Sequence, residues 1–236
     1  MTCKNCNTEI IYNFCPNCGQ PSVLKRIDGH YIAHEIEHVL HFDRGILFTV
    51  RELFINPGQS IRNYISENRS RLVKPVIFII LTSLIYTLIS LFFHVEDEYV
   101  KYERLEATAF VKILGWMQRN YGYMNIMTGM FIAVWLKVFF KKYEYNFFEL
   151  LIMLCFVLGI SMLIFAFFAL IEGTLNIKLL SIAGMIGVLY LTWATANFFE
   201  KNKIANYFKA LTCYLLGMIT FFIFTIGITI DIITKP

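Results

Sequence analysis

The sequence predicts an all-α membrane protein with five transmembrane helices. Three observations support this fold class. Hydrophobic residues make up 57% of the 236 residues and charged residues only 16%, against roughly 25% charged residues in soluble domains. Uncharged apolar runs long enough to cross a bilayer recur through the C-terminal part of the chain. The N-terminus is polar and rich in cysteine, so no cleavable signal peptide is expected there.

Residues 1–22 form the first predicted domain, a small zinc ribbon. Its cysteines follow the pattern Cys3-x2-Cys6-x8-Cys15-x2-Cys18. Each Cys-x-x-Cys turn can direct two thiolates at one point, and four thiolates fill the tetrahedral shell of zinc without leaving a position for water. We therefore expect these four cysteines to hold a structural Zn²⁺. A redox-active dithiol is the alternative interpretation of such pairs.

The charge of this head bears on its partners. Residues 1–22 contain one lysine, Lys4, and one acidic residue, Glu9. Proteins that bind nucleic acid need a basic surface, so we expect no nucleic-acid partner. Docking of a cytosolic protein, or stabilisation of the N-terminus, is the expected role.

Residues 23–74 form the second predicted domain, a cytosolic amphipathic helical region. The pattern predicts helices over 28–56 and 59–73, separated by a break at Asn56-Pro57-Gly58. Apolar residues recur at helical spacing on one face: Ile46, Leu47, Val50, Leu53 and Phe54. This pair of helices would lie in the headgroup plane of the membrane or pack on the cytosolic ends of the transmembrane bundle.

Four histidines share one face of the first of these helices: His30, His34, His38 and His41. The segment His34-Glu35-x-x-His38 matches the motif of zinc metalloproteases, in which the glutamate polarises a zinc-bound water. No later helix offers a convincing third ligand. A transition-metal site, a pH-responsive patch and an ordinary polar helix face are the other interpretations of this stripe.

Residues 75–236 form the third predicted domain, which holds the five spans. Each apolar run can cross a hydrocarbon core of about 30 Å at about 1.5 Å per residue. The predicted spans are 76–93, 121–140, 147–171, 177–199 and 210–230. Within the loop that joins the first two spans, the pattern of residues 105–119 predicts an interfacial helix or an extension of the second span.

The distribution of basic residues predicts the orientation. With five spans, fifteen of the 21 lysines and arginines fall on the side of the N-terminus and six on the other side. Basic residues accumulate on the cytoplasmic side of membrane proteins. We therefore expect a multi-pass protein of the cell inner (plasma) membrane, with its N-terminus cytoplasmic and its C-terminus outside.

The N-terminal half contains a series of short motifs that a known family shares. They are Cys15-Pro-Asn-Cys-Gly-Gln20, Asp43-x-Gly45-x-x-x-Thr49, Pro57-Gly58, Tyr64, Arg69, Arg71 and Lys74-Pro75. Over about residues 1–90 the chain resembles an uncharacterised family of bacterial membrane proteins that carries a domain of unknown function. Where members of that family more often have arginine before the Pro-Gly pair, this chain has Asn56. The resemblance implies no activity.

The predicted function is therefore that of an integral inner-membrane protein of unknown activity. A closed zinc shell and spans without an ionisable residue near mid-depth favour a non-enzymatic scaffold or adaptor whose head docks a partner. The first alternative is a transporter or lipid-handling protein, which predicts a cavity between the second and fifth spans. The second alternative is a membrane zinc metalloprotease that uses His34-Glu35-x-x-His38.

Overall fold

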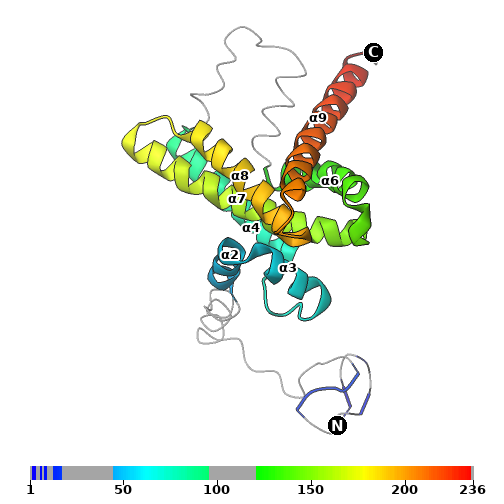
Figure 1. Ribbon diagram of the computed structural model, residues 1–236. Helices are drawn as coiled ribbons and strands as arrows, with labels where there is room; N and C mark the ends of the chain where they lie inside the picture. Colours follow the sequence, from blue (N-terminus) through cyan, green and yellow to red (C-terminus); the bar gives the residue numbers. More distant parts are fainter. Residues whose placement is uncertain are drawn as a thin grey trace. The chain divides into compact units, whose positions relative to one another are not determined.

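The computed structural model describes residues 2–3, 6, 8–9, 13–17, 45–95 and 121–234, with the side chains of 123–227 in the last range. The chain divides into two compact units, Met1–His41 and Phe42–Pro236. The described part of the first unit contains Cys3, Cys6 and Cys15 and an isolated antiparallel bridge between Thr2 and Glu9. Every regular element in the described residues of the second unit is a helix (Figure 1).

The second unit contains the following helices in chain order. They are α2 (Ile46–Ile55), α3 (Pro57–Ser66), α4 (Pro75–Phe93), α6 (Tyr121–Phe139), the 3₁₀ turn η2 (Lys141–Tyr143), α7 (Phe147–Leu175), α8 (Leu180–Phe199) and α9 (Ile204–Thr234).

The helices confirm the fold class of an all-α membrane protein. Four of them, α4, α7, α8 and α9, are long and apolar enough to cross a membrane, and α6 contributes a shorter apolar stretch, Tyr123–Phe139. These five helices occupy the segments expected to be spans, with shifted ends. At about 1.5 Å per residue, the 29 residues of α7 extend about 43 Å, which exceeds the ~30 Å hydrocarbon core.

The ends of these helices lie where local polar groups set them. Helix α7 begins with a capping box, in which Asn146 accepts from the Glu149 N–H and Glu149 accepts from the Asn146 N–H. It continues to Leu175 and ends at Asn176, whose left-handed backbone (φ 53°) terminates the helix. Helix α3 ends at Ser66, short of residue 73, and Asn68 then accepts hydrogen bonds from the N–H and hydroxyl of Ser70.

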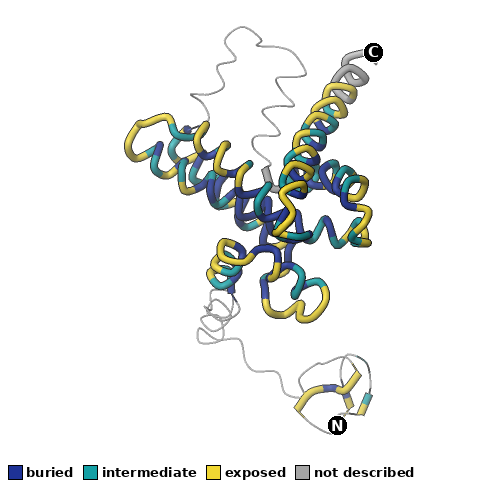
Figure 2. Tube along the Cα trace, in the orientation of Figure 1, coloured by how far each residue is buried: buried dark blue, intermediate teal, exposed yellow. Residues whose placement is uncertain are grey.

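Helix α7 is the centre of the bundle. It is the most buried of the apolar helices, and Figure 2 shows buried residues along α4, α7 and α8. Phe78 packs on Phe156 and Tyr86 on Phe165, with ring centroids 5.8 and 5.9 Å apart. Because residue numbers rise together in these pairs, α4 and α7 run parallel.

The other neighbours run antiparallel. Helices α7 and α8 are joined by a tight connection, in which the buried carboxylate of Glu172 accepts hydrogen bonds from the N–H groups of Leu179 and Leu180. Helices α6 and α9 cross at Gly217, where an added methyl group would lie 2.5 Å from an Ile132 side-chain carbon. One end of the bundle therefore holds the start of α4, α7 and α9 and the end of α6 and α8. We call it the cap end, because α2 and α3 pack there.

Candidate functional site

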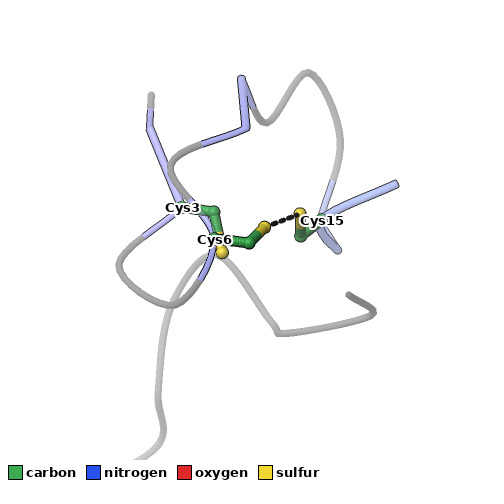
Figure 3. Close-up of side chains that lie close together, drawn as sticks. All are labelled: Cys3, Cys6 and Cys15. Carbon is green, nitrogen blue, oxygen red and sulfur yellow. Dashed lines mark hydrogen bonds between the residues drawn. The ribbon is translucent and has the colours of Figure 1, made fainter. Parts of the chain in front are cut away.

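The candidate metal centre consists of three cysteines from the N-terminal unit. The sulfur atoms of Cys3, Cys6 and Cys15 all lie within 4.8 Å of one another (Figure 3). The Cys6 and Cys15 sulfurs are 3.5 Å apart, far longer than a disulfide bond of about 2.05 Å. Zinc–sulfur bonds of about 2.3 Å in a tetrahedron place two sulfurs about 3.8 Å apart, so the observed spacing suits two ligands of one ion.

Hydrogen bonds around these cysteines hold the two turns together. The Cys3 N–H donates to the Thr8 carbonyl at 2.9 Å, which closes the first turn. The Thr8 hydroxyl lies 3.3 Å from the Cys6 sulfur and 3.4 Å from the Asn17 amide, which comes from the second turn. Thr8 therefore links the two turns, a role that the cysteine spacing alone did not indicate.

The donor set determines what this centre can hold. Cys3 and Cys15 are 1% and 3% exposed, so both residues are shielded from solvent. Soft thiolate ligands suit zinc, Cu⁺ and iron–sulfur clusters. Three close cysteines thus form a site able to bind a metal ion, and the fourth predicted ligand, Cys18, lies outside the described residues.

The histidine stripe also lies outside the described residues, since the structure describes none of the positions from 18 to 44. The metalloprotease motif His34-Glu35-x-x-His38 stays a prediction, as do the other interpretations of the stripe. The same holds for the helix predicted at 105–119.

The cap, which comprises α2, α3 and residues 67–74, meets α8 at a very close backbone contact. A methyl group on Gly58 would lie 2.2 Å from the carbonyl oxygen of Asn197 and 2.8 Å from the nitrogen of Phe198. No side chain fits there without moving one of the helices. The Pro-Gly pair identified in the sequence therefore has a structural reason: Pro57 begins α3, and Gly58 permits its approach to α8.

Arg62, one helical turn after Gly58, reinforces this contact. Its guanidinium donates to the carbonyl oxygens of Asn197 and Phe198, both at 2.7 Å. These carbonyls belong to the last turn of α8, whose oxygens lack partners within the helix and carry partial negative charge. The sequence analysis missed Arg62, although its four-residue spacing from Gly58 places it on the same helix face.

A second set of hydrogen bonds ties residues 67–74 to α2. The Thr49 hydroxyl donates to the Gly45 carbonyl and accepts from the Val73 N–H, both at 3.1 Å. The Glu52 carboxylate lies 3.2 Å from the guanidinium of Arg71 and accepts from the Ser60 hydroxyl. The chain is thereby fixed just before α4 begins.

The cap also packs on the interior helices. Tyr64 meets Phe156 edge-on, with ring centroids 5.2 Å apart, and burial raises the pKa of the Tyr64 hydroxyl. The Tyr190 hydroxyl donates to the Leu53 carbonyl at 2.9 Å. The amphipathic pair thus packs on the ends of the bundle, while Leu47 and Ile55 of α2 remain exposed.

A polar cluster joins the two connections at the cap end. The Glu200 carboxylate accepts from the Tyr143 hydroxyl at 2.9 Å and pairs with Lys203 at 2.7 Å. Asn206 donates to the Tyr143 oxygen and to the Glu200 carbonyl. Hydrogen bonds from Lys203 and Tyr143 lower the pKa of Glu200, and the hydrogen bond to Glu200 raises the pKa of Lys203. The sequence analysis did not identify this cluster.

Comparison with known proteins adds one result. Residues 43–93 match the family described as "Protein of unknown function (DUF3667)". The matched segment includes the whole of α2, α3 and α4. No curated protein matches the chain, and no solved structure does. The chain therefore joins a segment similar to this family of unknown function to further membrane-capable helices and to a cluster of cysteines able to bind metal.

Proposed function

We propose that this protein is a multi-pass membrane scaffold or adaptor. Its N-terminal head holds one structural Zn²⁺ through Cys3, Cys6, Cys15 and Cys18 and docks a cytosolic protein. The observation that carries the proposal is the convergence of three thiols within 4.8 Å. A fourth thiolate from the second Cys-x-x-Cys pair would close the shell, and a closed shell leaves no position for substrate or for an activated water.

The division of the chain supports a docking role. The head and the helical part form separate compact units, as expected of a recognition module attached to a membrane anchor. A head this small has little apolar core of its own, so metal binding would supply most of its folding free energy. Loss of the metal would then abolish docking.

The charge of the cap end supports an orientation in which that end is cytosolic. Basic side chains gather there from the cap, from both connections and from the adjacent turns of the bundle: Arg62, Lys74, Lys137, Lys141, Lys142, Lys201, Lys203 and Lys209. The opposite end carries Lys178 among its described residues. By the positive-inside rule, we propose a plasma or inner-membrane protein with a cytoplasmic N-terminus.

Metal analysis of the detergent-solubilised protein tests the head. We expect one zinc per chain in the wild type and loss of zinc in Cys15→Ser. Cys155→Ala is the matched control, because Cys155 lies in α7, outside the head, and its removal should leave the metal content unchanged. Full zinc content in Cys15→Ser would contradict the proposed ligand set.

Partner capture tests the docking role. Crosslinking in intact cells followed by purification should recover a cytosolic protein with the wild type and with Cys155→Ala, but not with Cys15→Ser. Identical sets of crosslinked proteins for all three would overturn the docking role, even if the metal site is correct.

The same measurements address the alternatives. A second zinc that disappears in His34→Ala/His38→Ala would favour the metalloprotease. A lipid-handling role was expected to show a cavity between the second and fifth spans, α6 and α9. Where these helices cross at Gly217, they leave no room even for a methyl group, which weighs against a pathway between them.

A further inference from the structure

An apolar groove lies between α4, α6 and α7. Its volume is about 290 Å³, close to the lower end of the ~300–1,000 Å³ range of ligand pockets. The lining comes from all three helices and includes Val76, Ile79, Ile126, Gly129, Leu151 and Leu154. The one amide in the lining, Asn125, donates to the Ser83 hydroxyl oxygen at 3.2 Å, so it already has a partner within the bundle.

The groove opens on the outside of the bundle. Val76 and Phe148, both part of the lining, are 52% and 73% exposed. Helix α4, which carries Val76, is among those apolar enough to span a membrane, so the outside here is hydrocarbon. Lining atoms without neighbours lose their dispersion contacts, and a polar occupant would lose its hydrogen bonds to water without replacement. A hydrocarbon chain would restore the dispersion contacts of the lining and has no hydrogen bonds to lose.

The charges beside the groove favour one kind of lipid. The groove reaches Pro75, the first residue of α4, and Lys74 directly precedes it. Lys74 and Arg69, in the connection from α3, are both exposed. Cationic side chains at the membrane surface attract anionic headgroups, and lysine is a common ligand of phosphate.

We propose that the groove binds one acyl chain of an anionic glycerophospholipid whose phosphate lies beside Lys74. This inference goes beyond the scaffold function and does not depend on the zinc head. It assigns a lipid-binding role to the junction of α4, α6 and α7. Of these helices, α4 lies in the segment that matches the family of unknown function.

Gly129 offers a way to block the groove. A methyl group on Gly129 would lie 3.4 Å from Leu158 and 4.0 Å from Leu154, in ordinary contact, so a larger side chain would extend into the groove. Gly227 in α9 is the matched control, because a methyl group there would meet no atom within 4 Å. Gly129→Leu fills the groove, and Gly227→Leu adds the same side chain to open surface.

The test uses a phosphatidylglycerol that carries a diazirine in one acyl chain, in nanodiscs with the full-length protein. After illumination, mass spectrometry maps the labelled peptides. We expect the lining peptides of α4, α6 and α7 to be labelled severalfold more than the exposed face of α9. Gly129→Leu should remove this excess and Gly227→Leu should retain it. Even labelling of all outward faces, or an undiminished excess in a folded Gly129→Leu, would overturn the proposal.

A second measurement needs no variant of the groove and holds if Gly129→Leu fails to fold. The ratio of groove labelling to α9 labelling is compared between nanodiscs of unlabelled phosphatidylglycerol and of phosphatidylcholine. Unlabelled phosphatidylglycerol competes with the probe for a saturable anionic site, so the labelling ratio should be severalfold lower in phosphatidylglycerol than in phosphatidylcholine. Lys74→Gln should remove this difference between the two lipids. Equal ratios for the wild type would refute the preference for anionic lipid.

Discussion

Replacement of Gly58 by alanine tests the contact between the cap and α8. The added methyl group would lie 2.2 Å from the Asn197 carbonyl oxygen and 2.4 Å from its carbonyl carbon. Both are backbone atoms, so no change of side-chain rotamer relieves the overlap. Helix α3 must move away from α8 by roughly 1 Å, and overpacking of this kind costs about 1–3 kcal/mol.

The same displacement weakens the two hydrogen bonds from Arg62 to the last turn of α8. Hydrogen bonds that involve a charged group contribute about 1.5–3 kcal/mol. We therefore expect Gly58→Ala to destabilise the protein by about 2–4 kcal/mol. For a chain of this size about 1 kcal/mol lowers Tm by about 2–4 °C, which predicts a decrease of about 4–16 °C.

The assay is thermal unfolding of the detergent-solubilised protein, followed by fluorescence-detected size exclusion. Gly184→Ala in α8 is the control, because its methyl group would lie 3.9 Å from the nearest atom, in the Phe165 ring. Alanine favours a helix over glycine by about 1 kcal/mol, so Gly184→Ala should leave Tm unchanged or raise it. Equal Tm values for Gly58→Ala and the wild type would show that the close approach of the two backbones does not constrain the fold.

Two further predictions concern the cap end, and a third concerns the orientation of the chain. Arg62→Lys keeps the charge but replaces the guanidinium, whose Nη1 donates to both carbonyls and whose Nη2 donates to Gln59, by a compact ammonium with a single nitrogen. Its Tm should therefore also fall below the wild-type value; full rescue by lysine would show that charge alone matters. Hydrogen bonds from Lys203 and Tyr143 lower the pKa of Glu200 in the folded state. The contribution of Glu200 to folding stability is therefore present above the unfolded-state pKa of about 4.3, and it is lost as the pH falls through the folded-state pKa. The Tm difference between wild type and Glu200→Gln should therefore shrink below about pH 4, and a constant difference would contradict this. In intact cells, a membrane-impermeant maleimide should not label the head cysteines until the membrane is opened; labelling from outside would reverse the proposed orientation.

Much of the fold could be predicted because its signal is local. An uncharged run such as that of α4 identifies a membrane-capable helix by length and composition, and the spacing of Cys3, Cys6 and Cys15 predicts their convergence. The break at Pro57 follows from the proline ring. These features depend on residues that are close to one another in the sequence.

The features that the sequence did not predict depend on distant partners. Arg62 bonds carbonyls some 135 residues later; its spacing from Gly58 places both on one helix face but does not identify α8 as the partner. Glu200 and Tyr143 meet because two connections lie at one end of the bundle. The groove arises where Gly129 faces α7, and a glycine in an apolar run indicates close packing as readily as an open space.

The parallel arrangement of α4 and α7 has a consequence for biogenesis. Two spans that run in the same direction cannot enter the bilayer as one hairpin. Helix α4 can therefore pack on α7 only after the intervening helix, α6, has crossed the membrane in the opposite direction. Until then the face of α4 that carries Thr82, which is buried and lies beside Gly159 of α7 in the finished fold, has no partner from α7. A ribosome stalled soon after α6 would thus hold a half-made protein whose first membrane-capable helix, α4, still lacks its partner α7.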